Sequence, residues 1–265
     1  MCRHLAYLGP PRDLATLLLA PPHSLLRQSY APVDMRGSGT INADGFGAGW
    51  YPGGAITPIR YRRAVPLWTD ATFAALATEV RSGAVLAAVR SATVGMPIMD
   101  TACAPFSTGR WLFSHNGRIA GWPDSVATLA RRLPVTDLLT LDAPTDSALL
   151  WALVRSRLAA GESLGCAIST VAAQVLDCAP SSRLNLLITD GATLAATTVH
   201  HALAVRVSDG EVLVCSEPTD DSSDWEPVAD GHLLTATSSA VDVVPIPEIP
   251  AADMAHADPT VTEEP

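Results

Sequence analysis

Cys2, the second residue of the chain, offers a thiol next to the N-terminus. If Met1 is removed, as an initiator methionine before a small residue normally is, Cys2 carries both a thiol and a free α-amine. These groups have unperturbed pKa values of about 8.5 and about 7.7–8.0, so the amine can accept the thiol proton near neutral pH. One residue then supplies nucleophile and general base, which is N-terminal-nucleophile catalysis. A chance cysteine beside the start codon is the alternative, and chemistry elsewhere in the chain must decide.

Arg90 follows an apolar run, residues 84–89, that predicts a buried strand. An arginine at the end of such a strand can hold a carboxylate through two parallel hydrogen bonds, and Thr93 would add a hydroxyl. An ordinary surface salt bridge is the alternative. Asp146 precedes an apolar helix, where it or Thr145 could serve as the N-cap. If Asp146 instead faces a pocket, it and Arg90 together would bind both charged ends of an α-amino acid.

His115, Asn116 and Gly117 follow a short predicted strand, Trp111–Ser114. Asn-Gly is first of all a turn signal. In the functional interpretation, the Asn116 side-chain amide and the Gly117 backbone N–H both donate to an oxyanion. His115 is expected to lie near the substrate in a mainly structural role, because a Cys-His dyad would not require its cysteine at position 2.

The segment Asp44–Tyr51 contains three glycines beside the aromatic residues Trp50 and Tyr51. A phosphate-binding loop is disfavoured, because no helix start with Lys-Ser/Thr follows. Close approach of the backbone to a ligand and a tightly packed strand are both compatible with the glycines. The segment Asp100–Phe106 predicts a loop.

Composition restricts the class of partner. The chain has 265 residues, 48% of them hydrophobic, which suffices for one large domain. The formal charge of -10, without a basic run, argues against nucleic acid and membrane surfaces and favours a small-molecule substrate. Five dispersed cysteines match neither a disulfide framework nor a zinc site. Since the sequence has no export signal and no membrane span, we expect a cytoplasmic protein.

Strand signals dominate both ends of the chain, and the middle is helical. Strands are predicted at His4–Gly9, Gly45–Tyr51, Ile56–Tyr61, Val85–Val89, Trp111–Ser114, Leu184–Thr189, Leu194–Val199, Ala204–Val207, Val212–Cys215, Leu233–Ala236 and Val241–Ile246. Helices are predicted at Thr72–Ser82, ended by Gly83, and at Ser125–Leu133, Thr145–Ala160 and Gly165–Leu176. Because helices do not regularly alternate with strands, the pattern favours an α+β fold with antiparallel sheets. We expect one domain over residues 2–246 and a disordered acidic tail over 247–265.

In this order, the segments resemble the glutaminase domain of class II glutamine amidotransferases, a branch of the N-terminal-nucleophile hydrolases, over about residues 2–245. The matching positions are the nucleophile Cys2, the glutamyl-binding Arg90, Thr93 and Asp146, the oxyanion donors Asn116 and Gly117, and the motif ending Pro105-Phe106. The resemblance implies a four-layer αββα fold. It also implies attack on a γ-glutamyl amide through a Cys2 thioester, with no metal or organic cofactor.

The chain departs from the family pattern at Ser91, Val94, Ala102 and Ala148. These positions neighbour the glutamyl-binding residues, so the departures bear on the leaving group rather than on the chemistry. No synthase segment follows in the sequence, which is most similar to the stand-alone actinobacterial members of ergothioneine biosynthesis.

That resemblance implies a histidine-betaine leaving group that carries a trimethylammonium. Aromatic faces bind such cations, and we expect Trp50, Tyr51 and Phe106 to supply them. Two alternatives remain open at this point. One is a glutaminase subunit that supplies ammonia to a separate synthase, and the other is a non-catalytic ligand-binding homologue.

Overall fold

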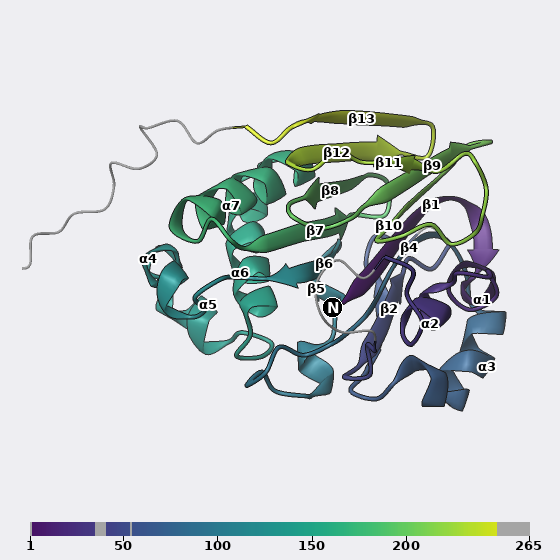
Figure 1. The fold of residues 1–265 in the computed structure, drawn as a ribbon, viewed down its shortest axis with the longest axis horizontal. Coiled ribbons are helices and arrows are strands. Elements are labelled where there is room, and N and C mark those ends of the chain that lie inside the picture. The colour runs from purple at the N-terminus through teal and green to yellow at the C-terminus, as the bar shows by residue number, and fades with distance from the viewer. Residues whose placement is uncertain (1, 35–40, 54, 248–265) are drawn as a thin grey trace, which may run out of the picture.

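The structure, a computed structural model, describes residues 2–34, 41–53 and 55–247. Within them, two antiparallel sheets are stacked face to face, with helices against both outer faces (Figure 1). This four-layer arrangement confirms the expected α+β class. Residues 248–265, nearly all of the predicted tail, lie outside the described part. No helix of the described residues is long and apolar enough to cross a membrane.

The first sheet has the strand order β11-β9-β10-β1-β4-β2-β3. Its strands are β1 (Arg3–Asp13), β2 (Phe46–Trp50), β3 (Ile59–Arg63), β4 (Arg81–Val89), β9 (Ala204–Ser208), β10 (Glu211–Cys215) and β11 (Glu226–Pro227). The outer face of this sheet carries α1 (Leu14–Leu18), α2 (Leu25–Gln28) and α3 (Ala71–Glu79). Strand β1 is central, since it pairs with β4 on one side and β10 on the other.

The second sheet has the order β13-β12-β8-β7-β6-β5. Its strands are β5 (Phe106–Thr108), β6 (Trp111–Arg118), β7 (Arg183–Thr189), β8 (Leu194–Thr198), β12 (His232–Thr237) and β13 (Ala240–Pro245). Between β6 and β7 the chain forms α4 (Ala127–Ala130), α5 (Val135–Leu139), α6 (Asp146–Ala159) and α7 (Leu164–Cys178). Single 3-10 turns lie at Leu67–Thr69, Asp100–Ala102 and Asp124–Val126.

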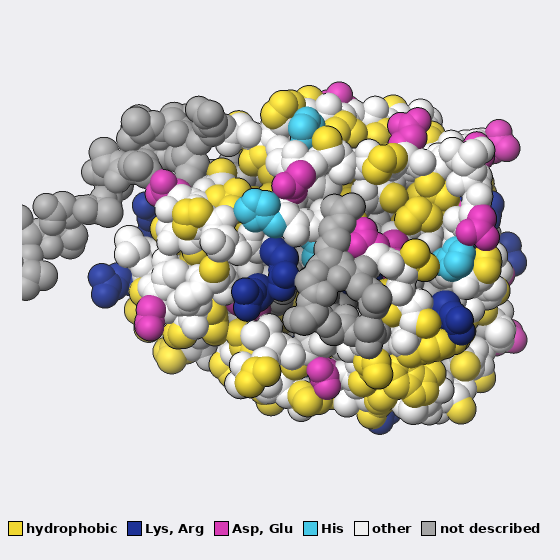
Figure 2. All heavy atoms as spheres, in the orientation of Figure 1, with side chains coloured by type: hydrophobic (Ala, Val, Ile, Leu, Met, Phe, Trp, Pro, Cys, Tyr) yellow, Lys and Arg dark blue, Asp and Glu magenta, His cyan; other side chains and the backbone are white. Residues whose placement is uncertain are grey.

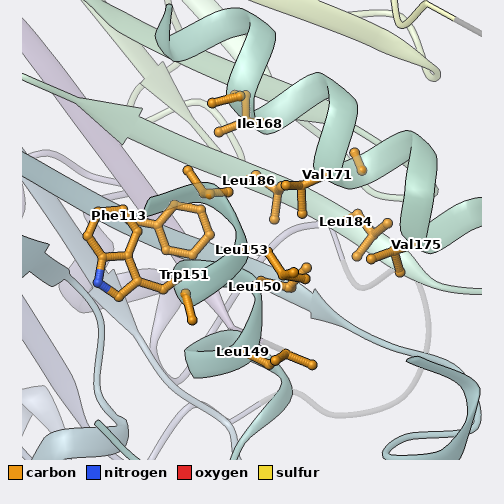
Figure 3. Packing of buried hydrophobic residues seen from close by; sticks show 14 of the residues in the cluster. Phe113, Leu149, Leu150, Trp151, Leu153, Ile168, Val171, Val175, Leu184 and Leu186 are labelled. Atoms are coloured by element: carbon orange, nitrogen blue, oxygen red, sulfur yellow. The ribbon is translucent and has the colours of Figure 1, made fainter. Parts of the chain in front are cut away.

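Three apolar clusters separate the layers. Helices α6 and α7 pack on the outer face of the second sheet, where Trp151 stacks on Phe113 with ring centroids 5.3 Å apart (Figure 3). A second cluster lies between the first sheet and α1 to α3. The third lies between the two sheets and is built from alternate residues of strands on both sides. Burial of these three surfaces is the main term that stabilises the fold.

Most predicted elements are confirmed, including the two helices α6 and α7 and the two hairpins β7–β8 and β9–β10. Gly83 is an exception, because it lies inside strand β4 and α3 has already ended at Glu79. A Cβ atom on Gly83 would lie 2.7 Å from the Gly9 carbonyl oxygen, so this glycine allows two strands to approach closely. The short helices α1 and α2 were not predicted.

Candidate active site

Side chains alternate between the two faces of a strand, and this alternation decides which polar residues point between the sheets. On β1, Ala6 and Leu8 belong to the cluster between the sheets, whereas Leu5 and Tyr7 pack against the helices. Continuing the alternation, His4 and Cys2 lie on the face that looks toward the second sheet.

The same alternation places Arg90 and Asn116. Leu86 of β4 and Leu112 of β6 pack between the sheets, so Arg90 and Asn116, four residues further along in each case, fall on the inward face. Because Arg3 pairs with Val89, Arg90 is the next residue opposite Cys2. We call this end of the sandwich the Cys2 end.

The backbone of Cys2 is fixed by a buried ion pair. The Arg3 guanidinium donates to the Cys2 carbonyl at 3.1 Å and lies 3.5 Å from the Glu217 carboxylate. Glu217 in turn accepts backbone N–H groups from Val33 and Asp34 at 2.9 and 2.7 Å. The Cys2 thiol is half-buried and donates to the Ser91 carbonyl at 3.6 Å. The residue beside the nucleophile therefore holds it in place from the helical side of the sheet.

A single hydroxyl connects Asn116 to the strand of the nucleophile. Ser216 Oγ accepts the Asn116 Nδ2–H and the His4 backbone N–H, each at 3.0 Å. This arrangement leaves one Nδ2 hydrogen of Asn116 for a second acceptor. Asn116 Oδ1 has no hydrogen-bond partner among the described residues. The amide is thus held with its donor side toward β1, as an oxyanion donor requires.

His4 and His201 are buried at the same end. Burial, together with nearby positive charge, lowers the pKa of His4 to about 3 and that of His201 to about 4. His4 Nδ1 lies 3.2 Å from Ser114 Oγ. Both rings are therefore neutral at neutral pH, so neither adds a competing charge beside the nucleophile.

Arg90 is anchored through its backbone, while part of its side chain is unengaged. Its N–H donates to the Gly45 carbonyl at 2.7 Å, and its carbonyl accepts the Asp44 N–H at 3.0 Å. Its Nη1 atom is buried without a hydrogen-bond partner among the described residues. A buried cationic donor with spare capacity fits the carboxylate-binding role. Thr93 lies nearby in the loop after β4 and is exposed.

Asp146 and Thr145 divide the two roles that the sequence left open. Thr145 is the N-cap of α6, since its side chain accepts the Ala148 N–H. Asp146 is buried, and its two carboxylate oxygens accept the backbone N–H groups of Ile119 at 3.0 Å and Ser147 at 2.8 Å. Ile119 directly follows β6, so Asp146 lies at the Cys2 end with lone pairs left for a further donor.

His115 and Gly117 lie within strand β6 rather than in a turn, so the turn interpretation of Asn-Gly is wrong. A Cβ on Gly117 would lie 1.9 Å from the Arg183 carbonyl oxygen, so the neighbouring strand requires glycine here. His115 alternates away from Asn116, toward α6, and lies 2.9 Å from Ser147 Oγ and 3.0 Å from the Arg183 carbonyl. This position agrees with a structural role.

Comparison with known proteins identifies the family. A sequence model of the class II glutamine amidotransferases matches residues 26–208, more than half of the chain. The chain belongs to this family.

Two curated relatives extend the match to most of the chain. A protein of Mycolicibacterium smegmatis named gamma-glutamyl-hercynylcysteine sulfoxide hydrolase is 44% identical over 246 residues, covering 93% of this chain and 100% of the relative. The protein of that name from Mycobacterium tuberculosis is 41% identical over 244 residues, covering 91% of this chain and 95% of the relative. These two relatives from the class II glutamine amidotransferase family are thus named as hydrolases.

Solved structures share its fold. A class II glutamine aminotransferase domain protein from Silicibacter pomeroyi is 25% identical with a TM-score of 0.67, covering 93% of this chain and all of that one. The phosphoribosylpyrophosphate amidotransferase of B. subtilis is 14% identical with a TM-score of 0.63, covering 93% of this chain and 49% of that one. The second likeness concerns the fold alone.

The structure does not bring the three predicted aromatic residues to the Cys2 end. Trp50 packs against the helices of the first sheet, and Phe106 is buried with Phe113 on the outer face of the second. Tyr51 follows Trp50, which pairs with Val85, at the opposite end of the sandwich. The placement of all three beside a leaving group is therefore corrected, because strand alternation and register direct them elsewhere.

Sequence reasoning assigned no role to Arg3, Ser216 and Glu217, although they position Cys2 and Asn116. Their signal was available: charged residues directly after Cys2 and after the apolar run of β10 are unusual in a buried strand pair. Cys103 is a further buried thiol near this end, and burial raises its pKa to about 11. Among the described residues, no group of His, Cys, Asp and Glu could hold a metal ion.

Proposed function

We propose that this protein hydrolyses γ-glutamyl-hercynylcysteine sulfoxide to glutamate and hercynylcysteine sulfoxide, a step of ergothioneine biosynthesis. The supporting observation is that Cys2, Arg90 and Asn116 point inward at one end of the sandwich, in a chain 44% identical to a hydrolase named for that substrate. Because the named relatives and this chain match over nearly their whole lengths, the reaction is proposed for the chain as a unit.

In the proposed reaction, the α-amine freed by removal of Met1 accepts the Cys2 thiol proton, and the sulfur attacks the γ-carbonyl carbon. The Asn116 amide, with the Gly117 N–H, donates to the resulting oxyanion. The leaving amine takes the proton as the C–N bond breaks, which leaves a γ-glutamyl thioester. Water then attacks the thioester and releases glutamate. No cofactor takes part.

Substrate recognition in this proposal uses the two ends of the glutamyl group. Arg90 binds the α-carboxylate with the help of Thr93, and Asp146 binds the α-ammonium. The unpartnered Arg90 Nη1 and the spare lone pairs of Asp146 support these assignments. His115 contacts the Ser147 hydroxyl, and the Ser147 N–H donates to Asp146, so His115 helps to position that carboxylate.

The test compares kcat/KM for γ-glutamyl-hercynylcysteine sulfoxide with kcat/KM for glutamine, with glutamate release as the readout. We expect the sulfoxide to be the better substrate. If glutamine is better, the protein instead supplies ammonia to a separate synthase. If neither releases glutamate, the chain is a binding homologue.

A further inference from the structure

Two arginines lie directly opposite each other at the Cys2 end of the second sheet. Arg118 ends β6 and pairs with Arg183, which begins β7. Asn116 pairs with Asn185 two residues further into the same strands, so alternation places both arginines on the inward face, next to the oxyanion donor. Like charges directly opposite each other on neighbouring strands destabilise a sheet. An anion bound between the two guanidinium groups would remove this cost.

Neither guanidinium has an ion-pair or hydrogen-bond partner within residues 2–34, 41–53 and 55–247. Arg183 Nε is buried, whereas Arg118 is exposed. Burial and the nearby Arg118 charge lower the pKa of Arg183. Figure 2 shows a compact group of arginine side chains near the middle of the face that it presents. Two adjacent guanidinium groups with unused N–H donors are suited to carboxylates, which accept their parallel hydrogen bonds.

The sequence itself contains an acidic partner for this pair. The segment 248–265 has five carboxylates in eighteen residues and no arginine or lysine: Glu248, Asp253, Asp258, Glu263 and Glu264. Its charge is therefore opposite to that of the arginine pair.

The segment also begins at the end of the sheet at which the arginines lie. The Ile246 N–H donates to the Gly231 carbonyl at 2.9 Å, and the Gly231 N–H donates to the Thr198 carbonyl at 2.7 Å. The next hydrogen bond of this row joins the Leu184 N–H to the Val199 carbonyl at 3.1 Å. The row crosses β13, β12, β8 and β7 in their order in the sheet, and Figure 1 shows β13 ending on the side on which β7 begins.

The distance along this row is short compared with the length of the segment. Three strand spacings of about 4.8 Å separate β13 from β7, which amounts to about 14 Å. An extended chain covers about 3.3 Å per residue, so about five residues after Pro247 suffice to reach β7. Asp253 and Asp258 therefore come within reach of Arg183 and Arg118.

We propose that the acidic segment 248–265 docks on Arg118 and Arg183 of the same chain and covers the entrance beside Asn116. The contact is autoinhibitory, because the arginine pair lies one row outward from the oxyanion donor and a substrate has to displace the docked segment. It is also ionic and partly exposed, so it weakens as salt is added. The docking itself depends on charge and position and not on the identity of the substrate.

Cross-linking tests the docking without turnover. The chain has no lysine, so Arg118→Lys introduces a single side-chain amine. A carbodiimide joins an amine to a carboxylate that contacts it, as an amide. Peptide mapping should find this amine joined to acids of segment 248–265, with a yield that falls in 0.5 M salt. In a mixture of ¹⁵N-labelled and unlabelled protein, both halves of each cross-linked peptide should carry the same label.

Arg81→Lys is the matched control, since Arg81 is exposed and begins β4 at the Tyr51 end. It should give no link to segment 248–265, whereas its register partner Asp13 should be linked and show that the reagent works. Links from Arg118→Lys to acids of the described residues alone would overturn the proposal. Equal links to the segment from both variants, or links only between differently labelled chains, would also overturn it.

The covering of the entrance is tested by KM. Replacing the five acids of segment 248–265 by their amides leaves every residue of the site in place. It should lower KM for the γ-glutamyl substrate about threefold at low salt, the weight of one or two exposed ion pairs, with kcat unchanged. The difference should vanish in 0.5 M salt. An unchanged KM at low salt would overturn the autoinhibitory contact. If no γ-glutamyl amide is hydrolysed, the proposed function fails and cross-linking still decides the docking.

Discussion

The two ends of the sandwich treat buried polar groups in opposite ways. At the Cys2 end, Arg90 Nη1, Asn116 Oδ1 and His4 Nε2 are buried without hydrogen-bond partners among the described residues. At the Tyr51 end, the Tyr51 hydroxyl lies 2.6 Å from the Arg110 carbonyl and 3.1 Å from that of Thr189. Burial raises the pKa of Tyr51, so the hydroxyl is a donor at neutral pH.

This difference separates a site from a structural corner. A buried polar atom without a partner costs about 1–3 kcal/mol, so a fold retains several together only where something else repays the cost. At the Cys2 end, in the proposed function, a bound substrate supplies the missing hydrogen-bond partners. At the Tyr51 end, the protein itself supplies the hydrogen-bond partners of the Tyr51 hydroxyl.

The largest expected effect belongs to Cys2. Cys2→Ala should abolish glutamate release while leaving the melting temperature near that of the wild type, because it removes the nucleophile and no buried packing group. Cys2→Ser should retain little activity, since a hydroxyl is a poorer nucleophile near neutral pH. Intact-protein mass spectrometry should show a fully active sample without Met1, and a retained Met1 in such a sample would contradict the mechanism.

All 17 basic residues apart from the histidines are arginines, so the N-terminal α-amine is the only primary amine of the chain. An aldehyde forms a thiazolidine only where a free amine and a free thiol share one cysteine. Thiazolidine formation should therefore label Cys2 alone and stop turnover in proportion to labelling.

Charge recognition comes next. Arg90→Gln and Asp146→Asn each leave a substrate charge unpaired, which costs about 2–5 kcal/mol when the pair is buried, or up to about 10³-fold in kcat/KM. The glutaryl amide, which lacks the α-amine, should be a poor substrate for the wild type. Asp146→Asn should narrow the gap between glutaryl and glutamyl amides. An unchanged gap would assign Asp146 to the fold alone.

Asn116→Ala should lower kcat by about 10²–10³ with a smaller change in KM, the usual loss for one oxyanion donor. Asn185, its partner on β7, provides the control. Its amide bonds the Ala202 carbonyl at 2.8 Å and the Val199 N–H at 2.9 Å. Asn185→Ala should therefore lower the melting temperature and leave kcat close to that of the wild type. Equal kcat losses in both variants would reduce Asn116 to a structural residue.

Acid should weaken the Cys2 end first. The pKa values of His4 and His201 are lowered to about 3 and about 4 in the fold, from 6.5, so the unfolded chain binds more protons as the pH falls below 6.5. For each of these two histidines, the free energy of unfolding should fall by up to about 1.4 kcal/mol per pH unit, until the pH reaches the pKa of that histidine in the folded state. Denaturant unfolding at several pH values measures this slope. His201→Gln should flatten this slope.

The smallest effect is expected at the Tyr51 end. Tyr51→Phe removes a satisfied hydroxyl and leaves two carbonyls to find other donors, so unfolding should become easier by about 1 kcal/mol. Activity should be unchanged. A large loss of kcat in this variant would show that the Tyr51 end is coupled to catalysis after all.

The fold could be predicted from the sequence where the apolar periodicity was strong. Helices α6 and α7 and the later hairpins followed from it directly. It failed where a residue type had two uses. Asn116-Gly117 has the composition of a turn but continues a strand, because the glycine is demanded by the adjacent Arg183 carbonyl. Gly83 likewise is required by the close approach of a neighbouring strand and does not mark a helix end.

The candidate site was partly readable for the same reason. Cys2 and Arg90 directly flank strands β1 and β4, Asn116 lies near the end of β6, and Asp146 begins α6. Their order along the chain matched a family. The aromatic residues could not be placed, because Trp50 and Phe106 depend on which face of a strand looks inward. Ser216 is distant in sequence from Cys2 and Asn116, and the pairing of β10 with β1 brings it close to them.

Strand β1 has neighbours on both sides, and residues Leu5 to Leu8 are in register with β4 and β10 alike. Amide hydrogens in such a strand exchange with solvent only when the whole domain opens. The nucleophile thus lies three residues ahead of the segment that we expect to exchange most slowly, while Thr93 and Val94, in the loop after β4, are exposed. A substrate can therefore reach the exposed loop while the Cys2 sulfur stays anchored next to a strand that is paired on both sides.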